Sequence, residues 1–314
     1  MRKLFFAALF GIMLSSGEIM ADNVKQPLNE NGLYIKGVCK AIASSPDGYV
    51  YVLTRDKRLI RIDYDGDQKE IAIPFNKEIK SEDDYFCDMA VDTKTAYFCG
   101  YNYSSILALD VNNPKELKAM NLSYENKPIN PMIISRNIDG WCLKDFDFRT
   151  FKVDKKGQMT LLPDSTEVVL DKKCQSVIVE QPVFTEEGKT IFPKKVFKED
   201  KSVRWVAPEA EAPKQVTSIE YLGFDIDRSL DVYLVKAASG ELDTEVTIYA
   251  VNNTNNSIVS KKVIPNSSLN FIMRYCKLTT DGSIIAVYAD PQNPDEQFIL
   301  KKFELKGIEP PNKG

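Results

Sequence analysis

A tight-turn segment that recurs six times constrains this chain more than any other feature. Each copy places turn-forming residues between two strand-like runs. The copies are Pro46-Asp47-Gly48, Asp92-Thr93-Lys94, Ile138-Asp139-Gly140, Glu186-Glu187-Gly188, Asp227-Arg228-Ser229 and Thr280-Asp281-Gly282. Positions 47, 93, 139, 187, 228 and 281 are separated by 46, 46, 48, 41 and 53 residues. Asp-Gly and related pairs accept the positive φ that tight hairpins require, so the spacing predicts a repeated hairpin-containing unit.

Each repeat contains the same kinds of strand in the same order. An apolar strand precedes each turn, as at residues 38–43 and 86–91, and a second strand follows it, as at residues 49–53. A third strand alternates apolar and polar residues, as at residues 246–249, and a weaker fourth strand follows in most units. Alternation over β-branched and aromatic residues is typical of strands. Four strands in about 45 residues predict the blade of a β-propeller.

We therefore predict an all-β fold, a six-bladed β-propeller of four-stranded antiparallel blades in residues 22–307. The blades are expected at approximately residues 36–75, 84–122, 131–163, 175–216, 218–264 and 270–307. The last unit lacks an evident fourth strand. Gly32, Leu33, Tyr34 and Ile35 are predicted to supply it, which would close the ring and cover an open strand edge. Residues 308–314, with two consecutive prolines, are expected to form a flexible tail.

The repeat layout resembles a known superfamily of six-bladed β-propellers, with its NHL-type, TolB-like and gluconolactonase-like members. The resemblance lies in that layout and in turns such as Pro46-Asp47-Gly48-Tyr49-Val50-Tyr51-Val52. It covers almost the whole of residues 22–307. The sequence has no WD dipeptide, kelch diglycine or YWTD signature, so no specific family motif is matched. The resemblance to gluconolactonase-like members implies, as one alternative, a divalent ion held on the axis by Glu, Asn and Asp.

Residues 1–21 are predicted to be a secretory signal peptide. Arg2 and Lys3 precede an apolar run at residues 4–14, and Ala21 is a small residue at the expected cleavage site. The run is too short to cross a bilayer as a helix, and no later segment approaches the ~18 apolar residues that a membrane helix needs. The alternative is a buried N-terminal helix. We expect the mature chain to begin near Asp22 and to be periplasmic or secreted.

The chain contains no histidine, and this excludes several kinds of chemistry. Ser-His-Asp and Cys-His catalysis, His-ligated zinc and His-ligated haem are all ruled out. The 41 basic residues are outnumbered by 45 acidic residues, which gives a net charge of −4. There is no basic excess to neutralise phosphates, so the charge does not favour nucleic-acid binding.

The six cysteines are expected to form disulfides, because an even number in an oxidising compartment favours pairing. The repeat predicts which cysteines lie close together. Cys87 and Cys99 would face each other across the first hairpin of the second blade. Cys142 and Cys174 are next in order, and Cys39 and Cys276 lie on the first strands of the first and last blades. A disulfide between Cys39 and Cys276 would close the ring covalently. The alternative is that some cysteines are buried thiols.

The loops that join second to third strands share one face of a propeller, and ligand sites commonly lie there. These loops and the adjoining strand ends carry aromatic and basic residues, from which we select a candidate binding site: Arg55, Arg58, Tyr101, Tyr103, Phe146 and Arg149. Rigid aromatic side chains beside arginine are typical of recognition surfaces. The alternative is packing at the strand ends together with solvated charge.

Acidic residues offer a second kind of candidate site. Glu82, Asp83 and Asp84 are adjacent, and Asp225 and Asp227 lie close in sequence, so carboxylates for Ca²⁺ are available. The alternative is a solvated loop, which is what adjacent acidic residues more often form. We expect an exported, non-catalytic propeller without a cofactor that binds a protein, peptide or envelope component on its loop face. The alternative is a Ca²⁺-type, metal-dependent hydrolase or lactonase resembling gluconolactonase-like propellers.

Overall fold

The fold was analysed in a computed structural model. It describes residues 26–75, 86–137, 139–163, 166–170, 176–180, 183–184, 190–193, 204–206, 216–225, 228–238, 244–252, 255, 257–265 and 271–305. The predicted signal peptide, the predicted tail, the acidic run at residues 82–84, Cys174 and Asp227 lie outside these residues. Within the described residues every regular element is a β-strand. The same residues contain no helix with the length and apolar character needed to span a bilayer.

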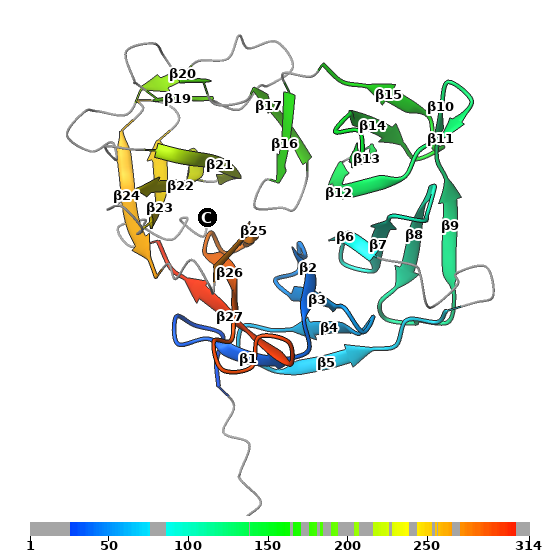
Figure 1. The fold of residues 1–314 in the computed structure, drawn as a ribbon, viewed down its shortest axis with the longest axis horizontal. Helices are drawn as coiled ribbons and strands as arrows, with labels where there is room; N and C mark the ends of the chain where they lie inside the picture. Colours follow the sequence, from blue (N-terminus) through cyan, green and yellow to red (C-terminus); the bar gives the residue numbers. More distant parts are fainter. Residues whose placement is uncertain are drawn as a thin grey trace, which may run out of the picture.

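Five four-stranded antiparallel sheets are arranged as blades around a common centre (Figure 1). The first blade contains β2 (Cys39–Ser44), β3 (Val50–Thr54), β4 (Leu59–Ile62) and β5 (Gln68–Ile71), and the second contains β6 (Phe86–Val91), β7 (Thr95–Gly100), β8 (Ser105–Asp110) and β9 (Leu117–Asn121). The third contains β12 (Pro131–Asn137), β13 (Gly140–Asp145), β14 (Thr150–Asp154) and β15 (Met159–Leu161). A short hairpin, β10 (Ser123–Tyr124) and β11 (Lys127–Pro128), connects the second blade to the third. This arrangement confirms an all-β propeller.

The last two blades come from the C-terminal part of the chain. The fourth blade contains β21 (Val216–Asp225), β22 (Leu230–Ala238), β23 (Thr244–Asn252) and β24 (Ile258–Ile264). The fifth contains β25 (Phe271–Leu278), β26 (Ile284–Ala289), β27 (Gln297–Phe303) and the N-terminal strand β1 (Leu33–Lys36). β1 pairs with β27 in antiparallel register, with Leu33 opposite Leu300 and Lys36 opposite Gln297. Strands from the two ends of the described chain therefore share one sheet.

The prediction of six four-stranded blades is wrong for residues 175–216. This part of the chain contributes to two smaller sheets, so the structure has five four-stranded blades. β16 (Thr166–Leu170) pairs with β17 (Ser176–Glu180), while β18 (Val183–Phe184), β19 (Thr190–Pro193) and β20 (Arg204–Val206) form the other sheet. From its place in the repeat, β17 would be the first strand of a blade and would pair with the strand that follows it. In the structure β17 pairs with β16, the strand that precedes it in the chain. Prolines at positions 182, 193 and 208 also interrupt this part of the sequence, and proline cannot donate to a strand ladder.

The hydrophobic core lies between neighbouring blades rather than in one central layer. Tyr51 and Leu53 pack with Phe98 between the first and second blades. On the other face of the first blade, Val50 and Val52 join a separate cluster with residues of the fifth blade and β1. Successive strand residues point to opposite faces of a sheet, and the first, second and fifth blades each bury both faces against their neighbours. The long chain is therefore accommodated by repeating a small unit, and not by enlarging one core.

The predicted first hairpins are present in the described blades. Asp92 Oδ1 accepts hydrogen bonds from the backbone N–H groups of Lys94 (2.8 Å) and Thr95 (2.7 Å), which fixes the turn between β6 and β7. Gly140 adopts a φ of +155°, and a Cβ there would lie 2.1 Å from the Val153 carbonyl oxygen. At this turn glycine is required both by the backbone conformation and by the close approach of β14.

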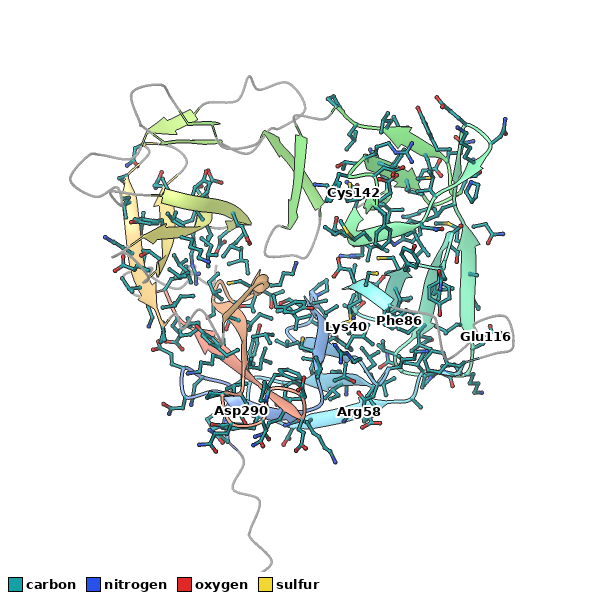
Figure 2. All side chains as sticks on the ribbon, viewed as in Figure 1. Lys40, Arg58, Phe86, Glu116, Cys142 and Asp290 are labelled. Carbon is teal, nitrogen blue, oxygen red and sulfur yellow. The ribbon has the colours of Figure 1, made fainter. Side chains whose placement is uncertain are left out.

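The first strands carry one-residue β-bulges that the sequence analysis missed. In four blades the first strand contains one extra residue near its start that has no partner on the second strand. These residues are Lys40, Cys87, Met132 and Thr217. Figure 2 shows Lys40 on the inner strand of the first blade. A bulge redirects the residues around it and shifts all pairing that precedes it by one position. No residue type is shared by the four positions, so no sequence signal marks them.

The predicted disulfides are not formed among the five described cysteines. The bulge at Cys87 places Asp88 opposite Cys99, where the sequence reading placed Cys87. Cys39 packs in the cluster shared by the first and fifth blades, whereas Cys276 packs on the opposite face of β25, against the fourth blade. The predicted disulfide between these two is therefore wrong. For the pair of Cys142 and Cys174, Cys142 is a buried thiol and Cys174 lies outside the described residues.

Candidate functional site

The loops between second and third strands lie at one end of the blades, opposite the first hairpins. We call this end the loop face. In the described chain it includes residues 55–58 of the first blade, 101–104 of the second, 146–149 of the third and 290–296 of the fifth. Antiparallel strands alternate direction, so every such loop must lie at the same end. The connection before β12, residues 129–130, reaches this face as well.

A hollow of about 380 Å³ lies on the loop face between the second and third blades. We call it the loop-face cleft. It is lined by Tyr101, Asn102, Pro128, Ile129, Asn130, Asp145, Phe146, Asp147 and Arg149. Three segments that are separate in sequence therefore meet there: the β7–β8 loop, the connection before β12 and the β13–β14 loop.

Exposed aromatic rings form one side of the loop-face cleft. The rings of Tyr101 and Phe146 meet edge to face, with centroids 5.1 Å apart and an interplanar angle of 89°. Tyr101 is 54% exposed and Phe146 is 37% exposed, although aromatic pairs of this geometry usually help to fill a core. Phe148, 69% exposed, lies two residues beyond Phe146, with the Lys144 Nζ atom 5.7 Å from its ring centroid. Large apolar side chains therefore remain open to solvent on two neighbouring blades.

Asp145 stabilises the conformation of the β13–β14 loop. Its side chain is buried and accepts hydrogen bonds from the backbone N–H groups of Asp147 (3.0 Å) and Arg149 (2.8 Å). Arg149 Nε donates a 2.9 Å hydrogen bond to Asp145 Oδ2, and Arg149 Nη2 forms an ion pair with the same oxygen at 2.7 Å. The hydrogen bond to Asp145 raises the pKa of Arg149 above its ordinary value. The buried carboxylate thus fixes both the turn and the position of Arg149.

A second carboxylate, Asp147, also reaches Arg149. Asp147 Oδ2 lies 3.2 Å from Arg149 Nη2, and 77% of the Asp147 side chain is exposed. One guanidinium is therefore shared by two carboxylates. Ser104 Oγ donates a 2.6 Å hydrogen bond to Asn130 Oδ1, which links the second blade to the segment that enters the third.

Arg55 and Arg58 lie outside the loop-face cleft. Arg58 donates to Asp56 Oδ2 (2.6 Å) and to the Lys36 carbonyl oxygen (2.7 Å), so it links the first blade to β1. Figure 2 shows Arg58 at the outer part of the first blade. Burial alone would raise the pKa of Asp56, but hydrogen bonds from Thr54 and Arg58 lower it below its ordinary value. Arg58 therefore has a structural explanation, and Arg55 is exposed on the same loop.

Tyr103 belongs to the core rather than to the loop-face cleft. It is buried, and its ring stacks on Phe86 at a centroid distance of 5.7 Å. Phe86 also stacks on Phe98 at 5.0 Å and on Phe75 at 6.0 Å. Of the six predicted binding residues, the structure brings together three: Tyr101, Phe146 and Arg149.

Sequence reasoning missed Asp145, Asp147, Asn102 and Asn130. The signal for the first two was present, because Asp145-Phe146-Asp147-Phe148-Arg149 follows a strand and alternates acidic and aromatic residues. An Asp that ends a strand often caps the turn after it. The two asparagines become neighbours of the cleft only through the packing of separate blades, which no local pattern reports.

The acidic candidates do not form a metal centre in the described part of the chain. Asp225 is buried and lies 3.1 Å from the Arg228 guanidinium. No group of three or more Cys, Asp or Glu side chains gathers closely enough to hold a metal ion among the residues that the structure describes. Residues 82–84 and Asp227 lie outside that part.

Two other hollows lie away from the loop-face cleft. One, of about 510 Å³, lies beside β1 and β27 and is lined in part by Tyr34, Tyr288 and Lys301. The other, of about 670 Å³, lies between the second and third blades near Tyr97 and Trp141. The Tyr97 and Trp141 rings meet edge to face at 5.3 Å, and both residues are partly buried. The predicted site residues lie in neither hollow.

Comparisons with known proteins give no family for this chain. No family model matches the sequence, and no curated protein matches it. A solved structure that carries a gluconolactonase designation is 10% identical, with a TM-score of 0.49 over 90% of this chain and 96% of the other. The Myceliophteria thermophila Cps50 (Swd1) β-propeller domain is 9% identical, with a TM-score of 0.49 over 88% and 99%. YCF48 bound to D1 peptide is 10% identical, with a TM-score of 0.46 over 84% and 81%.

The class of protein follows from the sheets themselves. Five four-stranded antiparallel blades around one centre define a β-propeller (Figure 1). Propellers carry many unrelated functions, so the function has to be argued from the site.

Proposed function

We propose that this protein is an exported, non-catalytic β-propeller that binds a protein or peptide partner at the loop-face cleft. The observation that carries the proposal is the exposed edge-to-face pair of Tyr101 and Phe146 beside a hollow of about 380 Å³. Rigid aromatic side chains lose little conformational entropy on binding and are enriched among the residues that dominate interface energies.

The surroundings of this pair support binding of an extended partner. The cleft is bounded by loops of two blades and by a proline-containing connection, so a partner would contact several rigid segments at once. The β13–β14 loop is already ordered by three hydrogen bonds to Asp145 and by the ion pair between Asp145 and Arg149 Nη2. A preformed surface gains affinity because little ordering is required on binding.

The proposal is tested with a library of short random peptides selected on the immobilised full chain. Fluorescence anisotropy then compares the unaltered protein with a Tyr101→Ala/Phe146→Ala double variant. We expect the double variant to bind the selected peptides at least about tenfold more weakly.

Tyr34→Ala is the matched control, because Tyr34 is also 54% exposed but lies on β1. It should bind the peptides as the unaltered protein does. If Tyr34→Ala and the double variant behave alike for every selected peptide, the loop-face cleft is not the binding site.

Export is a further part of the proposal and rests on the sequence of residues 1–21. A charged start, a short apolar run and a small residue at position 21 support cleavage before Asp22. Intact-mass analysis of the protein recovered from the periplasm or medium of an expressing bacterium should give residues 22–314. Recovery only of the uncleaved chain inside the cell would contradict export.

We also propose that β1 closes the propeller ring. The support is the antiparallel pairing of β1 with β27, together with the burial of Leu33 and Ile35 in the cluster between the fifth and first blades. Pairing a strand from one end of the chain with a blade from the other end removes an exposed edge.

A further inference from the structure

We propose that the loop-face cleft recognises a lysine or arginine side chain of its partner. This inference rests on the proposed function and specifies its chemistry. The sequence suggested aromatic side chains with arginine beside them, and the structure adds two carboxylates to this set.

The charged residues that line the cleft carry a net negative charge. They are Asp145, Asp147 and Arg149, which amount to two carboxylates and one guanidinium. Asp145 is fully engaged by two backbone N–H groups and by Arg149. Asp147 has one ion-pair contact at 3.2 Å, and 77% of its side chain is exposed. The charge left open to a partner is therefore the Asp147 carboxylate.

Arg149 is poorly placed to bind an acidic partner. Its Nε atom donates to Asp145, and its Nη2 atom forms ion pairs with both Asp145 and Asp147. An incoming carboxylate would be a third negative charge around this guanidinium, and drawing Arg149 away from Asp145 would leave a buried carboxylate without its counter-charge. Like charges at short range would also disfavour its approach to Asp147.

The aromatic pair complements the negative charge. Asp147 lines the same cleft as Tyr101 and Phe146, and the faces of aromatic rings attract positive charge. Other rings of this face already have cations near them: Lys144 Nζ lies 5.7 Å from the Phe148 centroid and Lys57 Nζ lies 5.2 Å from the Phe75 centroid. A carboxylate and aromatic faces together form a site for a lysine or arginine side chain.

The test uses the peptides selected on the full chain and a double-mutant cycle. We expect the peptides to be enriched in lysine or arginine. Replacing the critical lysine by norleucine, or the critical arginine by citrulline, should weaken binding about fivefold to tenfold. Asp147→Asn should weaken the unaltered peptide by a similar factor, and the two changes together should cost much less than their product, because both remove the same interaction.

Asp139→Asn is the matched control, since it makes the same charge change at the opposite end of β13, where Asp139 is exposed. It should leave binding unchanged, and salt should weaken the unaltered complex more than the Asp147→Asn complex. Acidic or charge-neutral peptides that still require Tyr101 and Phe146 but ignore Asp147→Asn would overturn this inference and leave the proposed function intact. Peptides that ignore the Tyr101→Ala/Phe146→Ala change would overturn both.

Discussion

At the scale of single residues, the shape of the candidate site depends on Asp145. This buried carboxylate stands where β13 ends, and it accepts hydrogen bonds from the next turn and from Arg149. Asp154 does the same at the far end of β14, accepting from the backbone N–H groups of Lys156 and Gln158 at 2.8 Å, and within the described residues no arginine pairs with it. Comparing substitutions of the two aspartates therefore separates the unfolding free energy lost with a turn cap from the unfolding free energy lost with the Arg149 contact.

Asp145→Ala should lower the free energy of unfolding by about 2–3 kcal/mol, because it leaves two loop N–H groups and a partly buried guanidinium without their acceptor. It should also weaken peptide binding at the loop-face cleft, since the β13–β14 loop loses its cap. Urea denaturation and fluorescence anisotropy measure the two effects. Asp154→Ala should cost about 1 kcal/mol and leave binding unchanged. Equal losses of binding in the two variants would contradict this account of the loop.

Asp281, in the first hairpin of the fifth blade, makes stability depend on pH. Burial alone would raise its pKa, but hydrogen bonds from Lys302, from Thr279 and from the Ser283 backbone N–H lower it below the ordinary value of 3.8. A carboxyl whose pKa is lower in the folded state stabilises the fold above the unfolded pKa, and this stabilisation is lost as pH falls through the folded pKa. The contribution is about 1 kcal/mol or less, because 37% of the side chain is exposed.

The difference in unfolding free energy between the unaltered protein and Asp281→Asn should therefore be constant near neutral pH and shrink in acid. Urea denaturation from about pH 7 to about pH 3 measures it. The exposed Asp139→Asn change should show a smaller difference throughout. A difference for Asp281→Asn that grows as the pH falls would have the wrong sign for this account.

At the scale of elements, β1 and the first strands show which features a sequence reveals. The hairpin turns were predictable, because Gly48 and Gly282 adopt the positive φ that their Asp-Gly pairs suggested. The alternation of buried and exposed residues in β1 follows from Leu33, Tyr34, Ile35 and Lys36 by type alone. The bulges were not predictable, because they depend on how each first strand meets its neighbours near the centre of the ring.

Ile35→Ala tests whether β1 holds the ring together. Ile35 is 1% exposed and packs between the fifth and first blades, so its truncation should lower the free energy of unfolding by about 2–4 kcal/mol. Tyr34→Ala, one residue away on the exposed face, should cost less than about 1 kcal/mol. Differential scanning calorimetry compares the two. Similar small effects would show that β1 is a peripheral strand and would contradict ring closure.

At the scale of the whole molecule, the length of the repeat was a better guide to the structure of a blade than the number of repeats was to the number of four-stranded blades. It predicted four-stranded antiparallel blades, and the described residues form five of them. It failed at residues 175–216, where β17 pairs with β16 rather than entering a blade. The Cys87–Cys99 and Cys39–Cys276 pairings failed because they depend on which face of a strand each cysteine occupies. The bulge at Cys87 places Asp88, and not Cys87, opposite Cys99. Tyr275 and Cys276 lie on opposite faces of β25, and Cys276 lies on the face away from Cys39.

The described cysteines should therefore behave as thiols in the purified protein. After denaturation without reductant, Cys39, Cys87, Cys99, Cys142 and Cys276 should all react with a maleimide and be found labelled by peptide mapping. In the folded protein Cys99 and Cys276 should react slowly, because burial raises their pKa values well above the ordinary value of 9.0. Any of these five cysteines found in a disulfide would contradict the packing described for its strand.

Site-specific photo-crosslinking tests the central claim most directly. Tyr101→p-benzoylphenylalanine places a reactive group in the loop-face cleft while keeping an aromatic side chain, and Tyr34→p-benzoylphenylalanine places it on β1 at equal exposure. With a peptide selected on the full chain, irradiation should give a crosslink at position 101, lost in the presence of excess unlabelled peptide, and none at position 34. Crosslinking at position 34 alone, or equally at both positions, would contradict binding at the loop-face cleft.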